Sequence, residues 1–532
     1  MTARLRLTEE NRRWWTLVAM CFALFMIMLD NTVVNVALPS IQRDLGADLA
    51  ALEWTINAYT LSFAVLLVTG GRLGDIFGRR RMFLAGVVIF AVSSAAIGLA
   101  PTDTALVAGR AVQGVGAALM MPATLSIISN AFPPHERGKA IGTWAGVSAL
   151  ALAIGPVFGG FLTEEVSWRA IFFLNLPVAV GAVVVTLFAA RESRDETVER
   201  RIDFPGILTL TTGLTALVLA LVEGNQWGWG SPRIVALLVV AGLGLAAFAA
   251  VELRTRVPMV DFSFFRSRSF LGANLVAFVV SFAMLAMFFF IALYMQNILG
   301  YSPLEAGVRF LPSTLMVMVV GPLAGRASDR IGPRPLMVAG LLIVAASMFW
   351  QARIEVDTGF DYLLPAFVAM GIGIALVMSP MSTAAMNAVH PSKAGVASGV
   401  LSMSRMVGGT FGVAGLGALV ATVGGSRLRE LLPDVPHAQR EHLIDSLGAG
   451  ASSSGVGAGS PVAEAMREAF VHALQYGLLI GGAVALVGAV FAATLVGDRA
   501  ERGPDTVLGD VEAAAAASPV PEQARAAEPV RS

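Results

Sequence analysis

Long apolar runs recur along almost the whole chain, and they constrain its fold more than any other feature of the sequence. Most hold about 20 mainly apolar residues, the length that an α-helix needs to cross the hydrocarbon core of a bilayer. Lipid offers no partners to backbone polar groups, so such a segment pairs its own groups as a helix. The sequence therefore predicts an all-α polytopic membrane protein. The fourteen expected spans are residues 14–39, 54–70, 82–100, 104–129, 140–163, 169–190, 204–222, 233–252, 270–298, 307–325, 335–352, 363–388, 395–422 and 469–496.

The composition agrees with a chain whose main solvent is lipid. Of the 532 residues, 56% are hydrophobic and 14% are charged, whereas soluble domains carry roughly 25% charged residues. The first run begins at Trp14 and is longer than the apolar core of a signal peptide, so we interpret it as an uncleaved first helix. The single cysteine, Cys21, excludes an intramolecular disulfide framework.

Basic residues are distributed unevenly over the predicted loops. With both termini placed in the cytoplasm, 26 of the 37 Lys and Arg residues fall on the cytoplasmic side and nine on the outer side. Cytoplasmic loops are enriched in Lys and Arg, so the pattern predicts a multi-pass protein of the cell membrane with both termini inside. The 37 acidic residues balance the basic ones, which leaves no electrostatic footprint for nucleic acid.

A ten-residue string occurs twice and indicates an internal duplication. The turn expected after the second span reads GRLGDIFGRR at 71–80, and the turn expected after the tenth reads GRASDRIGPR at 325–334, with five of ten positions identical. A short basic, glycine-rich turn could arise independently at the inner leaflet. The shared spacing of Gly, Arg and Asp favours duplication of a half.

These strings carry a family resemblance. GRLGDIFGRR is similar to the signature between helices two and three of the major facilitator superfamily, whose members consist of two six-helix halves around a central site. LDNTVVNVALPSI at 29–41, LVAGRAVQGVGAAL at 106–119, GVSALALAIGPVFGG at 146–160 and SWRAIFFLNLP at 167–177 resemble further strings of its fourteen-span drug:proton antiporters. The second copy of the repeat follows the tenth span rather than the eighth, so two extra spans are expected between the halves.

The resemblance implies a domain organisation. We expect a six-helix half, a linker with two extra spans, and a second six-helix half; the glycine- and serine-rich outer loop and the alanine- and proline-rich tail are expected to be poorly ordered. The boundaries are 1–13 for a cytoplasmic head, 14–190 for the first half, 191–269 for the linker, 270–497 for the second half with its outer loop at 423–468, and 498–532 for the tail.

Asp30 is the first candidate for proton coupling. It is a carboxylate well inside a predicted span, and an ionisable residue within the membrane is costly enough to suggest a function. Arg110 in the fourth span lies at a compatible depth, with Gln113 one turn further on. A proton from outside would weaken the attraction of Asp30 for Arg110 or for a bound cation. The alternative is a permanent ion pair that only fixes helix packing.

Residues for gating follow from the repeat and the fifth-helix string. Asp75, with Arg79 and Arg80, is expected by resemblance to face the start of the helix near Ser392, and Glu136 and Arg137 are candidates to join it. Small residues in the fifth helix allow close contact between the halves, although ordinary helix packing explains them equally well on physical grounds. The proposed gating residues are Gly71, Asp75, Gly78, Arg79, Arg80, Gly146, Gly155, Pro156, Gly159, Gly160 and Asp329.

Substrate contacts are expected from polar, thioether and aromatic side chains within spans, which suit varied apolar or cationic ligands. Each of them individually fits core or lipid packing as well. Arg405 is a separate candidate because the second half shows no obvious acid to pair with it. The candidates are Met26, Asn31, Asn35, Gln113, Phe282, Phe289, Tyr294, Gln296, Asn297, Met378, Met381, Asn387 and Arg405.

The expected activity is proton-coupled export of drugs, antibiotics or related amphipathic molecules, by a protein that functions as a monomer in the lipid bilayer. Export of one metabolite, lipid or siderophore, and passive facilitation, are the alternatives. We expect no enzymatic activity, cofactor or metal, because the spans lack clustered nucleophile patterns, no GxxxxGKS-type loop occurs, and His437, His442 and His472 lack metal-ligand spacing.

Overall fold

The computed structural model describes residues 8–47, 49–195, 202–255, 258–448 and 460–497. Over these residues the secondary structure is helical throughout. Fourteen helices or helix pairs are long and apolar enough to cross a membrane, and each corresponds to one of the fourteen spans expected from the sequence. The chain is therefore a multi-pass membrane protein.

Seven helices form the first half, in which α6 and α7 together make the sixth span. Polar side chains fix several helix starts; Thr102, for example, accepts a hydrogen bond from Ala105 N at the start of α4. The helices are α1 (Glu9–Leu45), α2 (Leu49–Phe77), α3 (Arg79–Gly98), α4 (Asp103–Ala131), α5 (Arg137–Glu165), α6 (Trp168–Phe173) and α7 (Asn175–Ala189).

The second half holds the remaining six spans of the duplicated core. Short π-helical stretches, Tyr294–Ile298 and Val420–Gly424, continue α10 and α15. The helices are α10 (Arg268–Leu293), α11 (Pro303–Arg309), α12 (Leu311–Ile331), α13 (Pro333–Gln351), α14 (Phe360–Asn387), α15 (Ala394–Leu419), α16 (Gly425–Leu431), α17 (His437–Gly448) and α18 (Pro461–Leu495).

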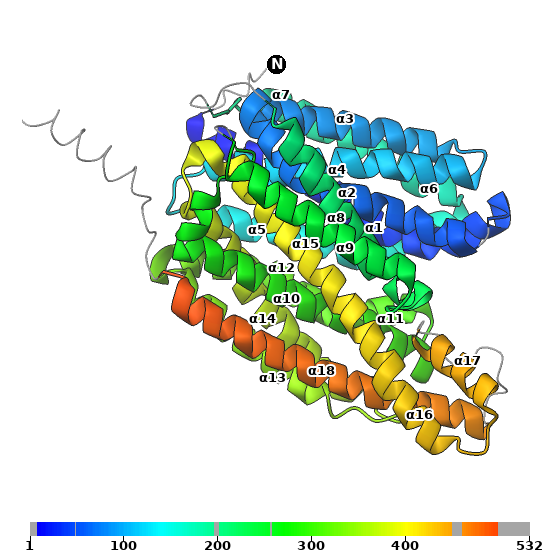
Figure 1. Ribbon diagram of the computed structural model, residues 1–532. Helices are drawn as coiled ribbons and strands as arrows, with labels where there is room; N and C mark the ends of the chain where they lie inside the picture. Colours follow the sequence, from blue (N-terminus) through cyan, green and yellow to red (C-terminus); the bar gives the residue numbers. More distant parts are fainter. Residues whose placement is uncertain (1–7, 48, 196–201, 256–257, 449–459, 498–532) are drawn as a thin grey trace, which may run out of the picture.

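The two halves lie side by side as one bundle, the first half drawn in blue and cyan and the second in green to orange (Figure 1). The main contacts between them are made by α2 with α15 and by α5 with α12. The start of α1 and the end of α18 lie at the same end of the bundle, and α16 and α17 lie at the opposite end. We call these the Gly78 end, after the turn between α2 and α3, and the α17 end.

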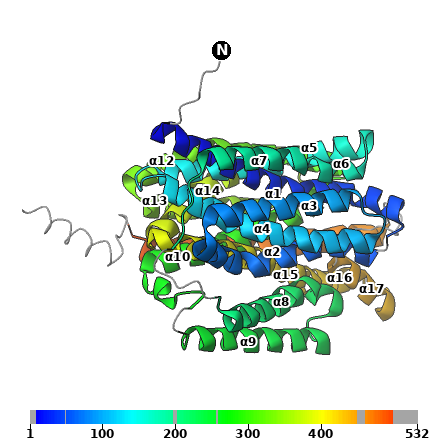
Figure 2. The same cartoon turned by 90° about the horizontal axis from the view of Figure 1, so that it is seen from above.

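The two extra spans form a hairpin on the outside of the bundle. Helix α8 (Phe204–Trp227) packs on α9 (Pro232–Glu252), and also on α2 and α15, so α9 is the outermost element (Figure 2). A short 3-10 helix, Phe262–Arg266, then leads into α10. The hairpin therefore sits along one of the two seams between the halves.

Two expectations about loops were wrong. Most of the 71–80 and 325–334 strings is helical: Gly71 and Asp75 lie in α2, Asp329 lies in α12, and the turns are confined to Gly78 and Gly332, which have φ of 108° and 86°. Part of the outer loop is also ordered, as α16 and α17. Helices continue past the hydrocarbon because their ends find protein partners, which apolar run length does not reveal. The head residues 1–7 and the tail 498–532 lie outside the described residues.

Candidate functional site

Asp30 lies at the centre of a buried hydrogen-bond network in the first half. Its side chain is enclosed by α1, α4 and α7 and is 1% exposed. It accepts hydrogen bonds from Arg110 Nη1 at 2.5 Å, from Gln113 Nε2 at 2.9 Å and from Asn175 Nδ2 at 3.1 Å. The carboxylate is thus paired with a cation and has two further amide donors, which is how a buried charge is made tolerable.

Arg110 is held in place by contacts beyond Asp30. Its Nε donates to Thr55 O at 3.0 Å, its Nη1 also donates to Gln113 Oε1 at 2.6 Å, and its guanidinium carbon lies 4.3 Å from the centre of the Tyr59 ring. The ring face and the carbonyl restrain the guanidinium even when its salt bridge weakens. A change of charge on Asp30 therefore acts on an arginine that is anchored to α2.

The structure brings together Asp30, Arg110 and Gln113, which were singled out from the sequence, and adds four residues that were not. Ser94 accepts hydrogen bonds from Gln113 Nε2 at 2.7 Å and from Asn175 Nδ2 at 3.1 Å, and it is 0% exposed. Thr55 and Tyr59 contribute from α2. The only sequence signal for any of them was the position of Asn175 inside the SWRAIFFLNLP string. A single Ser, Thr or Tyr in an apolar run does not indicate that the residue belongs to a polar network.

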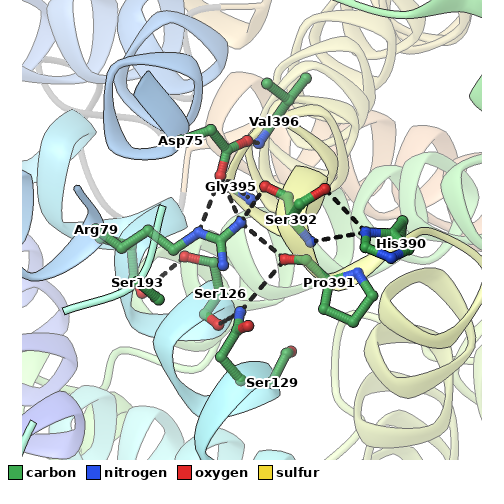
Figure 3. Close-up of polar contacts among 12 residues, drawn as sticks. Asp75, Arg79, Ser126, Ser129, Ser193, His390, Pro391, Ser392, Gly395 and Val396 are labelled. Carbon is green, nitrogen blue, oxygen red and sulfur yellow. Dashed lines mark hydrogen bonds and ion pairs between the residues drawn. The ribbon is translucent and has the colours of Figure 1, made fainter. Parts of the chain in front are cut away.

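A second cluster ties the two halves together at the Gly78 end (Figure 3). The Asp75 carboxylate accepts hydrogen bonds from Gly395 N at 2.9 Å and Val396 N at 2.8 Å, in the first turn of α15. Arg79 Nη2 donates to Asp75 Oδ1 at 2.7 Å and to Ser392 O at 2.6 Å. A carboxylate at a helix N-terminus is favoured by the unpaired N–H groups and the helix dipole. We call Asp75, Arg79 and their partners from Ser392 to Val396, at the start of α15, the Asp75 latch.

Asp329 makes the equivalent contact in the opposite direction. Its carboxylate accepts hydrogen bonds from Gly138 N at 2.9 Å and Lys139 N at 3.1 Å, at the start of α5. Each copy of the repeated string thus caps a helix of the other half. The two copies differ in one contact between the halves. Arg79 donates to carbonyls of the other half, whereas Pro333 stands at the matching position of the second copy and has no side-chain donor to make this contact.

Glycines allow the backbones of the two halves to touch beside these caps. A Cβ on Gly71 would collide with Gly395 O, one on Gly138 with Asp329 Oδ1, and one on Gly142 with Gly321 O. Further along α5, a Cβ on Gly146 would lie 3.2 Å from Met318 O. Hydrogen bonds between α1–α7 and α10–α18 gather here too, including Ser379 Oγ to Gly138 O at 3.1 Å. The bundle is closed between its halves at the Gly78 end.

The rest of the fifth-helix string packs within its own half. A Cβ on Gly155 would collide with Thr32, one on Gly159 would lie 3.0 Å from Val33 Cα, and one on Gly160 would lie 3.9 Å from Val36, all on α1. Pro156 lies in α5 between them. Contact between the halves through Gly155 and Gly159 is therefore not found; the pattern of small residues could not say which neighbour they face.

Other predicted gate residues take different partners. Arg80 donates from its backbone N to Glu192 Oε1 at 3.0 Å and from Nη2 to Leu187 O at 3.1 Å, so it binds the end of α7 and the segment after it rather than the second half. Glu136 pairs with Arg13 at 2.7 Å. Arg137 Nη1 donates to Asn387 Oδ1 at 2.7 Å, which places Asn387 at the closed end instead of in a substrate cavity.

The proposed substrate residues divide by exposure. Met26, Tyr294 and Met381 are fully buried in core clusters, and Tyr294 Oη donates to Glu355 O and Thr358 O near the α17 end. Three of the predicted contacts are thus enclosed by neighbouring side chains in this conformation. Side chains with accessible surface are Asn31, Asn35, Phe282, Phe289, Gln296, Asn297, Met378 and Arg405.

The linker that follows the extra hairpin also contacts the second half near the Asp75 latch. Lys393 Nζ lies 2.8 Å from Asp261 Oδ2, and Lys393 directly precedes α15. Partial burial acts to raise the pKa of Asp261, but hydrogen bonds from Lys393 and Ser263 outweigh it and hold this pKa below its usual range. No feature of the sequence indicated this contact.

Within the described residues, no three His, Cys, Asp or Glu side chains gather in a way that could hold a metal ion. The polar groups instead form two arrangements: an enclosed carboxylate–guanidinium pair in one half, and matched helix caps that close one end of two duplicated halves. Such an arrangement suits a protein whose halves move about a central path.

Comparison with known proteins agrees with this architecture. Residues 20–413 match the family model described as Major Facilitator Superfamily. The chain belongs to the major facilitator superfamily. It is therefore a transmembrane transporter by family and not an enzyme.

Two relatives within the superfamily match nearly end to end. A tetracenomycin C resistance and export protein of Streptomyces glaucescens is 36% identical over 511 residues, which cover 93% of this chain and 94% of the relative. A puromycin resistance protein of Streptomyces alboniger is 38% identical over 502 residues, with the same coverage of both chains. Among solved structures, a proton:xylose symporter of the superfamily aligns with a TM-score of 0.58 over 92% of this chain and 97% of its own, at 14% identity, and so supports the fold alone.

Proposed function

We propose that this member of the superfamily is a proton-coupled antiporter that exports antibiotics or related small amphipathic molecules by alternating access. The observation that carries the proposal is the Asp30 network, in which a titratable carboxylate enclosed among α1, α4 and α7 is bonded to an anchored arginine. The two similar proteins, one named for antibiotic resistance and export and the other for antibiotic resistance, support the choice of substrate class.

The proposed cycle uses the charge of Asp30. The charged form is stabilised by Arg110, Gln113 and Asn175. A proton on the carboxylate removes its charge and one acceptor, so Arg110 loses its counter-ion and its hold on α1 weakens. Helices α1, α2 and α4 then shift relative to one another, and return when the proton leaves.

The Asp75 latch and the Asp329 cap hold the two halves together at the Gly78 end, so the substrate path between the halves is closed at that end. We propose that this end is cytoplasmic, as the distribution of Lys and Arg predicts, and that the described conformation is closed on the cytoplasmic side. Opening that side requires the Asp75 latch and the Asp329 cap to separate. The protein is proposed to function as a monomer in the cell membrane.

Accumulation in everted vesicles tests coupling against passive facilitation. Vesicles with a proton gradient should accumulate puromycin against its concentration, and collapse of the gradient by a protonophore should abolish the accumulation. Equal concentrations on both sides, with or without the gradient, would indicate a passive facilitator. No movement of any compound in a panel of antibiotics would leave export of a single other metabolite or lipid as the better account.

A further inference from the structure

The spans of the second half contain one charged residue near their middle, Arg405. It lies eleven residues after the start of α15, which corresponds to about 17 Å along the helix axis, close to half the thickness of the hydrocarbon core. The acidic residues of the second-half spans all lie near helix ends; they are Glu305, Asp329, Asp361, Glu430, Glu464 and Glu468. No carboxylate of these helices is at the depth of Arg405.

Arg405 has no hydrogen bond, ion pair or aromatic contact with any described residue, in contrast to Arg110, whose guanidinium is fully engaged. Its side chain is nevertheless only half-buried, and none of its nitrogens is among the buried atoms that lack a partner. An unpaired guanidinium inside a span costs so much in lipid that such residues face the bundle interior or a water-filled path. The accessible nitrogens of Arg405 are therefore directed at space that water or a ligand can fill.

Apolar surface lies beside this cation. Gly409 is one turn beyond Arg405 on the same face of α15, and a Cβ there would collide with Leu285 on α10. Leu285 is 42% exposed and Phe289, one turn further along α10, is 49% exposed. The aliphatic side chain of Leu285 thus lies about one turn from this charge, and the Phe289 ring lies at least one turn further toward the α17 end. Among the described residues of the opposite half, Asp30 is enclosed by its own donors and so does not compete for Arg405.

We propose that Arg405 recognises an oxyanion, a carboxylate or sulfonate, on an amphipathic substrate whose apolar part lies against Leu285. This inference rests on the proposed export function and adds organic anions to the class of substrates that the protein exports. The planar guanidinium matches a carboxylate or sulfonate through two parallel N–H donors, which a lysine ammonium cannot reproduce.

The test compares two dyes that share one ring system and differ in charge. Anilinonaphthalene sulfonate carries the anion and N-phenylnaphthylamine lacks it. Their binding to the purified full-length protein in nanodiscs is measured by equilibrium dialysis, for the wild type, Arg405→Gln and Arg405→Lys. Arg353→Gln removes the same charge from an exposed position near the α17 end and is the matched control; monodispersity and thermal unfolding establish that each variant is folded.

The proposal predicts that the wild type binds the sulfonate more tightly than the uncharged dye. Arg405→Gln should weaken sulfonate binding about tenfold or more, as expected for the loss of a charge-assisted bidentate contact, and leave the uncharged dye within about twofold. Arg405→Lys should fall between them, and Arg353→Gln should match the wild type. Equal loss for both dyes, or no loss for the sulfonate, would overturn the proposal.

Failure of this inference can be distinguished from failure of the export function. Puromycin accumulation in everted vesicles is measured with the same Arg405→Gln variant. If that variant still accumulates puromycin while the two dyes bind without discrimination in the wild type, export stands and anion recognition falls. If the wild type accumulates nothing, the proposed function falls, and the dialysis result still decides what Arg405 binds.

Discussion

Asp30 illustrates which single residues can be identified from a sequence of this kind. A carboxylate, an arginine and a glutamine stand out inside apolar runs because each is costly in lipid, and the structure joins all three. Asn175 and Ser94 complete the network from α7 and α3. They could not be assigned in advance, since small polar residues are common in membrane helices and pair across the bundle.

We expect Asp30→Asn to fold and to lose resistance-conferring export. The amide keeps the size of the side chain and one acceptor oxygen but leaves Arg110 without a counter-ion, so the charge-dependent step cannot occur. The inhibitory concentration of puromycin for cells that express the variant should fall to that of cells without the protein. Asp44→Asn on the same helix is the control: Asp44 pairs with Arg169 near the α17 end, half-exposed, and its loss should change the inhibitory concentration by less than about twofold.

Asp261 allows a prediction about pH because it lies outside the membrane spans. Its pKa is lowered in the folded protein, so its contribution is fully present above the unfolded value of about 3.9 and is lost as the pH falls through the folded-state pKa. Asp261→Asn should lower the unfolding temperature slightly and by the same amount between about pH 6 and 8, with the difference starting to shrink only below about pH 4 and vanishing once the pH is below the folded-state pKa. A difference that changes steeply near neutral pH would contradict the assignment.

At the scale of helices, the sequence predicts which spans exist and in what order, but not where each helix ends or which helices pack against it. The apolar runs correspond one to one with the fourteen spans, yet α2 and α12 continue past them to Phe77 and Ile331. The same limit applies to glycines. All three of Gly142, Gly155 and Gly159 lie in α5, but Gly142 contacts the other half, whereas Gly155 and Gly159 contact α1. A glycine in a helix indicates a close neighbour but not which element that neighbour belongs to.

The two caps at the Gly78 end should differ in strength. Asp75 and Asp329 each accept two backbone N–H groups of the other half, and Asp75 also pairs with the fully buried Arg79. We predict that Asp75→Asn slows puromycin efflux about tenfold and Asp329→Asn about threefold, because the first also leaves a buried arginine unpaired. Initial rates of efflux at saturating substrate provide the measurement, and a larger effect at Asp329 would argue against the role of Arg79.

A substitution of Gly142 tests whether backbone contact between the two halves is needed to close the bundle at the Gly78 end. Gly142→Val places a side chain against Gly321 O, so the halves cannot approach and the closed conformation is disfavoured. Efflux should fall by about tenfold or more, and cysteines introduced near Asn387 should become more reactive to a membrane-impermeant thiol reagent from the cytoplasmic side. Gly181→Val is the control, as nothing lies within 4 Å of a Cβ there. Equal labelling in both variants would show that closure does not depend on this contact.

For the whole molecule, the duplicated string carries the most information. It predicts two related halves separated by an insertion, and the structure shows each copy capping a helix of the opposite half. The position of the inserted hairpin was not predictable, because apolar helices give no sign of which seam they cover. The contact of Lys393 with Asp261 shows that the segment after the hairpin reaches the start of α15.

The central claim is that protons and substrate exchange through Asp30. The direct measurement is substrate-induced proton movement in proteoliposomes that contain a pH-sensitive dye, with the wild type, Asp30→Asn and Asp44→Asn reconstituted in equal amounts. Addition of puromycin should move protons in the wild type and in Asp44→Asn, and should move none in Asp30→Asn. Proton movement in Asp30→Asn equal to that of the wild type would contradict the account.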